Sequence, residues 1–179
     1  MNVQNLIADG RAIHVRELRN ELAKAKAENQ ALREENAALR EHFDLALAAA
    51  RDLGALAAGA RFYLVDGWNL ILGANRLAAS REELEKNWRA HLDAHPADFV
   101  WIVYDGKYES SREDRRLRVS YTGGIGLHRA DRFSIDFLRM ARWLTLADRV
   151  SVVTRDKDFR REAERLGALT ADKNTEVSV

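Results

Sequence analysis

The feature that most constrains this chain is a seven-residue repeat of mainly apolar side chains that runs through its N-terminal part without a slip. The a positions are Val15, Leu22, Asn29, Asn36, Phe43 and Ala50, and the d positions are Leu18, Ala25, Leu32, Leu39, Ala46 and Leu53. Heptads sustained over this length are typical of a coiled coil, in which a second helix covers the apolar seam. The repeat therefore predicts a long helix that associates with another helix.

Charged residues beside the seam indicate how two such helices would pair. The g positions hold Glu21, Glu28 and Glu35, and the e positions that follow hold Lys26, Arg33 and Arg40. In a parallel dimer each g residue meets the e residue five positions later on the partner, so each side gains three Glu–Lys/Arg pairs. The two a-position asparagines favour a fixed register and two strands. We expect a parallel homodimer, although a single amphipathic helix packed on its own domain is the alternative.

The rest of the chain has a different composition, which indicates a globular domain. All four tryptophans and all four tyrosines lie beyond residue 60, and Gly54 and Gly59 flank an alanine-rich stretch at the joint. We expect a coiled-coil helix over residues 1–58 and a globular domain over residues 61–179. Hydrophobic residues make up 46% of the chain, which is enough for a packed core. The absence of cysteine excludes disulfides, thiol nucleophiles and thiolate zinc sites.

Apolar runs alternate with helical patterns along the second domain. The runs predict strands at 62–65, 99–104, 119–122 and 150–153, with a short last strand around Leu169. Helical spacing of apolar residues predicts helices at 77–95, 130–146 and 158–166, with Trp88, Trp101 and Trp143 facing the core. Because the strands are almost continuously apolar and alternate with helices, we expect an α/β fold with a mostly parallel sheet covered by helices on both faces.

Four aspartates stand where such a fold binds ligands. Asp66, Asp105 and Asp156 follow predicted strands, and Asp131 lies at the start of the helix predicted from residue 130. Ligands bind beyond the carboxyl ends of strands in open α/β sheets, so we expect these acids to converge at one edge. Clustered carboxylates repel one another unless a cation neutralises them, and oxygen ligands suit Mg²⁺ or Mn²⁺. Taken singly, Asp66 and Asp105 also fit Asp-Gly turns, and Asp131 and Asp156 also fit helix N-caps.

Four segments, in order, resemble NYN domains, the PIN-like nuclease group that includes the YacP-like proteins. The first resembles the family's opening strand and its Asp-Gly-x-Asn motif, which matches Asp66 and Asn69: Phe62-Tyr-Leu-Val-Asp-Gly-Trp-Asn-Leu-Ile-Leu72. The others resemble the second strand ending at Asp105, the helix with the central acid Asp131 and the strand ending at Asp156: Val103-Tyr-Asp-Gly106, Ala130-Asp-Arg-Phe-Ser-Ile135 and Val152-Val-Thr-Arg-Asp-Lys-Asp-Phe159. The resemblance covers about residues 61–170. Many relatives carry a second acid beside the central one, where this chain has Arg132.

The resemblance implies a PIN-like, Rossmann-like fold and a divalent-metal-dependent endoribonuclease. Asp66, Asp131 and Asp156 would hold Mg²⁺ or Mn²⁺, Asn69 would orient a water or an RNA phosphate, and Asp105 would be an accessory ligand or a loop anchor. The metal would generate hydroxide and offset charge on the scissile phosphate. One alternative is a catalytically weak or inactive domain that binds RNA, the ribosome or another protein partner. A third hypothesis is a scaffold that works through the coiled coil alone.

Arginines near the predicted acids are the expected RNA contacts, because arginine binds phosphate bidentately. They lie in the loop expected from Lys107 to Arg118 and beside Asp156, and they are Arg112, Arg115, Arg116, Arg155 and Arg160. Both segments have mixed charge, so a solvated surface is the alternative interpretation. The five histidines show no recognisable metal spacing. No apolar run approaches the ~20 residues of a membrane span and no leader is present, so we expect a cytoplasmic protein.

Overall fold

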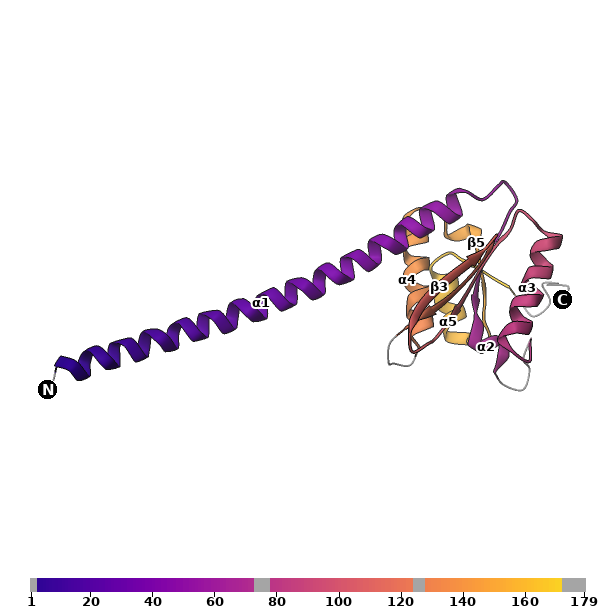
Figure 1. Cartoon of the computed structure of the whole chain (residues 1–179). Helices are drawn as coiled ribbons and strands as arrows, with labels where there is room; N and C mark the ends of the chain where they lie inside the picture. Colours follow the sequence, from indigo (N-terminus) through magenta and orange to yellow (C-terminus); the bar gives the residue numbers. More distant parts are fainter. Residues whose placement is uncertain (1–2, 73–77, 124–127, 172–179) are drawn as a thin grey trace. The chain divides into compact units, whose positions relative to one another are not determined.

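The computed structural model describes residues 3–72, 78–123 and 128–171, and the chain forms two compact units, Met1–Phe43 and Asp44–Val179 (Figure 1). The first unit is the greater part of helix α1 (Val3–Gly54), so the long helix expected from the heptads is present. Seam residues Val15, Leu18, Leu22 and Leu32 are 46–56% exposed along this helix. No helix in the described ranges is both long enough and apolar enough to cross a membrane.

The second unit is built on a six-stranded sheet with the order β3-β4-β2-β1-β5-β6. Its strands are β1 (Phe62–Asp66), β2 (Phe99–Tyr104), β3 (Glu109–Asp114), β4 (Leu117–Thr122), β5 (Val150–Val153) and β6 (Leu169–Thr170). Every neighbouring pair is parallel except β3 with β4 at one edge. The fold is therefore α/β with a mostly parallel sheet. The apolar runs predicted β1, β2 and β5 because strands covered on both faces need apolar side chains on both.

Helices cover both faces of this sheet (Figure 1). On one face α4 (Arg129–Trp143) and α5 (Lys157–Arg165) pack over Phe62, Leu64 and Val152. On the other, α2 (Gly67–Ile71) and α3 (Arg81–Ala94) pack over Tyr63, Val65 and neighbouring strands. A short 3-10 helix, η1 (Ala147–Arg149), precedes β5. The hydroxyl of Ser80 accepts a hydrogen bond from the Glu83 amide, which confirms the predicted N-cap of α3.

The last turns of α1 belong to the core of the second unit. Leu45, Ala49 and Leu53 are buried in the same cluster as Phe62. Leu53 is the last d position of the heptad pattern, and its contacts are made within its own chain. In this stretch the alternative prediction, a helix packed on its own domain, is the correct one. Of these three buried residues only Leu53 is a seam position, and the a residues Phe43 and Ala50 are exposed. The helix end therefore packs through a face other than the heptad seam, which the repeat could not reveal.

The segment predicted as a loop from Lys107 to Arg118 is instead the β3–β4 hairpin. Glu109 pairs with Thr122, Asp114 pairs with Leu117, and Arg115 adopts a positive φ of 57° in the turn. Every residue of β3 is exposed, so the strand carries no apolar pattern by which sequence could reveal it. The hairpin turn lies at the amino end of β4, away from the carboxyl ends of the parallel strands.

Candidate functional site

The candidate site lies at the carboxyl ends of β1, β2 and β5. From β1 the chain continues to β2 on one side, and β5 lies on the other side of β1, so the strand order reverses between β1 and β5. Such a switch point is where open α/β sheets bind ligands. Asp66 ends β1, and Thr154 directly follows β5 beside it.

Asp66 is the most buried acid of the site, with 5% of the residue exposed. Thr154 Oγ1 donates a hydrogen bond of 2.8 Å to Asp66 Oδ2, and the side-chain amide of Asn69 donates to the same oxygen. Asp66 also caps α2 by accepting from the Asn69 backbone amide. Burial raises the pKa of Asp66, the hydrogen bonds from Asn69 and Thr154 oppose this shift, and the charge of Asp131 adds to it. Three hydrogen-bond donors thus hold the Asp66 carboxylate, but they do not fully offset the free-energy cost of burying its charge.

Asp131 lies in the first turn of α4 and is half-buried. His128, the residue before the helix, has a left-handed backbone with φ 60°, and its Nδ1 lies 3.1 Å from Asp131 Oδ2. Burial raises the pKa of Asp131, His128 opposes the shift, and the charges of Asp156 and Asp105 add to it. The N-cap of α4 is His128, so the alternative that Asp131 caps this helix is wrong.

The other two acids each have a structural task at this edge. Asp156 caps α5, and its Oδ1 accepts from the amides of Asp158 and Phe159 at 2.7 and 3.0 Å. Asp105 Oδ1 accepts from the Ala130 amide at 2.7 Å and so fixes the start of α4. Trp68 Nε1 donates to the Asp105 carbonyl, and Arg81 lies over the Trp68 ring, so this indole packs into the edge of the sheet.

The four acids influence one another electrostatically but do not form a tight ligand set. The charge of Asp131 acts on Asp66, and the charges of Asp105 and Asp156 act on Asp131. In the described ranges, His91, His95 and Asp98 each place one potential ligand atom within 4.8 Å of the others. Within the same ranges the four aspartates do not form such a set. The acids therefore lie near enough to influence one another's pKa, but they are not arranged as a ready set of ligands.

The predicted RNA-binding arginines divide into two groups. Arg155 and Arg160 flank Thr154 and Asp156, and Arg160 donates to the Thr154 carbonyl at 2.9 Å. Arg112 is paired with the Glu85 carboxylate at 2.6 Å. Arg115 and Arg116 lie in the hairpin turn at the opposite end of the sheet, where Arg116 donates to the Ala97 carbonyl. The structure brings only the first group to the acids.

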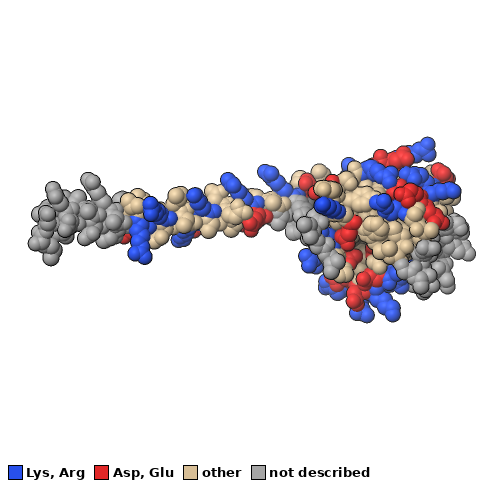
Figure 2. Space-filling view, turned by 60° about the horizontal axis from the view of Figure 1, so that its bottom comes forward, with Lys and Arg blue, Asp and Glu red and all other residues tan. Residues whose placement is uncertain are grey.

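Basic and acidic side chains lie side by side over the second unit (Figure 2). The hairpin follows this pattern, because Arg112 pairs with Glu85 and Arg118 pairs with Glu113. In the hairpin the mixed-charge surface, which was the alternative interpretation, describes the structure better than a continuous basic rim.

Two residues of the site were missed by sequence reasoning. Thr154 links Asp66 to the amide of Asp156, which donates to the same hydroxyl at 3.1 Å. The available signal was its place directly after β5. His128 contacts Asp131 from three positions earlier, which is a helix-start spacing. Comparison of the chain with protein-family models, curated proteins and solved structures found no match.

Proposed function

We propose that the second unit is a metal-dependent endoribonuclease of the NYN, PIN-like type. The observation that carries the proposal is the buried carboxylate of Asp66 at the switch point, which Asn69 and Thr154 hold by hydrogen bonds. The charge of Asp131, from a separate element, adds to the raised pKa of Asp66. Both are partly or wholly buried, and burial raises the pKa of each. A site that keeps acids at such a cost is typical of a functional centre.

Mg²⁺ or Mn²⁺ fits this donor set, because both ions prefer carboxylate oxygens. Asp66, Asp131 and Asp156 would hold the ion, which when bound supplies an acidic water and offsets charge on a phosphate. Asn69 and Thr154 position the Asp66 carboxylate, because both donate hydrogen bonds to it. Asp105 anchors the start of α4, and its negative charge helps to raise the pKa of Asp131. Arg155 and Arg160 stand beside the acids, where they would contact RNA phosphate.

A second candidate function is RNA binding without cleavage. The arrangement of the four aspartates favours this function. In the described ranges their carboxylate oxygens are not gathered within 4.8 Å of one another, as the potential ligand atoms of His91, His95 and Asp98 are. The absence of an acid next to Asp131, where the chain has Arg132, points the same way.

The two functions are separated by incubating the full chain with end-labelled single-stranded RNA. We expect internal cleavage with Mn²⁺ or Mg²⁺ and none with EDTA, because the chemistry depends on the ion. Retention of RNA on a filter without cleavage in any metal would establish the binding function instead. Neither cleavage nor binding would contradict both.

We further propose that the first unit joins two chains as a parallel coiled coil. The exposed a and d side chains along residues 15–37 support this proposal, since an apolar seam in water is covered by a partner helix. The predicted e/g pairs would set the parallel orientation.

Replacing Leu22 and Leu32 together by glutamate is expected to convert the dimer to a monomer, because two charged side chains would enter the apolar seam. Size-exclusion chromatography with light scattering measures the outcome as the mass of two chains for the wild type and of one chain for the variant. Asn20→Glu is the matched control, since position 20 lies on the outer face of the heptad. A variant that keeps the wild-type mass would show that this seam does not join the chains.

A further inference from the structure

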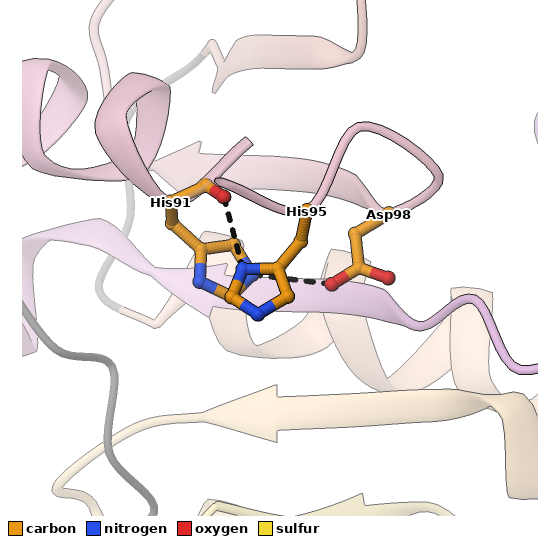
Figure 3. Close-up of side chains that lie close together, drawn as sticks. All are labelled: His91, His95 and Asp98. Carbon is orange, nitrogen blue, oxygen red and sulfur yellow. Dashed lines mark hydrogen bonds and ion pairs between the residues drawn. The ribbon is translucent and has the colours of Figure 1, made fainter. Parts of the chain in front are cut away.

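A second cluster of potential ligands lies at the end of the sheet opposite the acids. His91 is in the last turn of α3, His95 directly follows that helix, and Asp98 directly precedes β2 (Figure 3). Asp98 also accepts a hydrogen bond of 2.8 Å from the amide of Arg61, just before β1. The cluster thus sits at the amino ends of β1 and β2, whereas the aspartates of the candidate nuclease site lie at the carboxyl ends.

The geometry of the three side chains is close to that of a metal site. One potential ligand atom from each lies within 4.8 Å of the others. His91 Nε2 is 3.2 Å from Asp98 Oδ2, and the two imidazole rings stack with centroids 4.5 Å apart. Two atoms bound to one tetrahedral Zn²⁺ at about 2.1 Å lie about 3.4 Å apart, which is close to the separation of His91 Nε2 and Asp98 Oδ2. His95 Nδ1 lies 3.1 Å from the His91 carbonyl oxygen, which orients the second ring beside the first.

Burial and charge also suit a cation here. His91 and Asp98 are 8% and 7% exposed, while His95 is exposed and gives access from solvent. The buried Asp98 carboxylate accepts a hydrogen bond from the Arg61 amide through one oxygen and contacts His91 Nε2 through the other. A bound cation would compensate that charge.

We propose that His91, His95 and Asp98 form a Zn²⁺ site that fastens the end of α3 to the start of β2. Two imidazole nitrogens and one carboxylate oxygen favour Zn²⁺ over Mg²⁺ or Mn²⁺, which prefer oxygen. Three protein ligands leave the fourth position to water on the side of the exposed His95. The site is separate from the proposed nuclease centre and does not depend on that function. Its alternative is a purely structural pair, in which His91 packs edge-on against Tyr63 and Trp88 and bonds to Asp98.

The test is a calorimetric titration of the metal-free full chain with Zn²⁺ in excess Mg²⁺, which occupies oxygen-only sites. We expect one Zn²⁺ per chain and at least about tenfold weaker binding in His95→Ala. Loss of a group that only supports a ligand already lowers metal affinity about tenfold or more, and loss of the ligand itself should lower it at least as much. His95 is exposed, so this variant should fold, and circular dichroism checks that it does. Asp93→Asn is the matched control because it removes an exposed carboxylate near the end of the same helix and should bind as the wild type does.

Co²⁺ provides a second readout that reports ligand geometry. The wild type is expected to give the visible absorption bands of four-coordinate Co²⁺, and His95→Ala is expected to lose them. Absence of Zn²⁺ binding by the wild type, or equal Zn²⁺ affinity in wild type and His95→Ala, would overturn the proposal. Either result would leave the RNA-cleavage assay unaffected, so the two proposals can fail separately.

Discussion

Asp131→Asn is expected to lower Mn²⁺-dependent RNA cleavage at least about 100-fold, because the substitution removes a proposed metal ligand and its charge. Fold stability should not fall with activity. Burial raises the pKa of Asp131, so the charged carboxylate is less favourable in the folded chain than in the unfolded one at neutral pH. Asparagine removes that charge and keeps an oxygen that can accept from His128. Loss of activity at an unchanged or higher melting temperature would therefore identify a functional acid.

The matched control for this experiment is Asp136→Asn on the same helix. Asp136 pairs with the exposed Arg139 and lies outside the set of acids that act on Asp131. Its replacement should leave cleavage within about twofold of the wild type, as expected for an exposed ion pair. Equal cleavage by Asp131→Asn and the wild type would remove Asp131 from the mechanism.

Arg118→Met is expected to lower the free energy of unfolding by about 1.5–3 kcal/mol, because it removes charged hydrogen bonds to Asp52 and Glu113 while Arg51 still pairs with Asp52. Arg118 and Asp52 have side chains only 7% and 4% exposed, and their closest atoms lie 2.5 Å apart. The guanidinium also lies 4.8 Å from the ring centroid of Trp101. Asp52 belongs to the last turns of α1, so this pair fixes the helix end to β4 within the second unit.

Urea unfolding of three variants separates the pair from its environment. Asp52→Leu combined with Arg118→Met should be less destabilised than Arg118→Met alone, since replacing both charges by apolar groups leaves no buried charge in this pair. Arg139→Met removes an exposed ion pair and should cost less than about 1 kcal/mol. If Arg118→Met also lowered the free energy of unfolding by less than about 1 kcal/mol, the ion pair would contribute little to the stability of the fold.

The parts of the fold that sequence predicted are those in which a side-chain pattern corresponds to burial. Strand β2 was predicted with its observed bounds because all six of its residues are buried. Strand β3 was missed because all six of its residues are exposed, and its pairing with β4 is carried by backbone hydrogen bonds. Trp143 was expected in the core and is 75% exposed, since it is the last residue of α4.

The candidate site was predictable to the extent that it follows from strand ends. Parallel strands bring their carboxyl ends to one edge, so the proximity of Asp66, Asp131 and Asp156 could be expected from the order of elements. The contact of Thr154 with Asp66 depends on which strand neighbours β1, which sequence does not state. The cluster of His91, His95 and Asp98 depends on the chain reversal between α3 and β2. Its four-residue histidine spacing was the available signal, and no recognised motif drew attention to it.

The central claim, a divalent ion held by the aspartates at the β1–β5 switch point, is tested most directly by anomalous diffraction from crystals of the full chain soaked in Mn²⁺. The account predicts an anomalous peak between the carboxylates of Asp66, Asp131 and Asp156, which is lost in crystals of Asp131→Asn. Well-ordered carboxylates with no peak between them at millimolar Mn²⁺, or a peak that persists in Asp131→Asn, would contradict it.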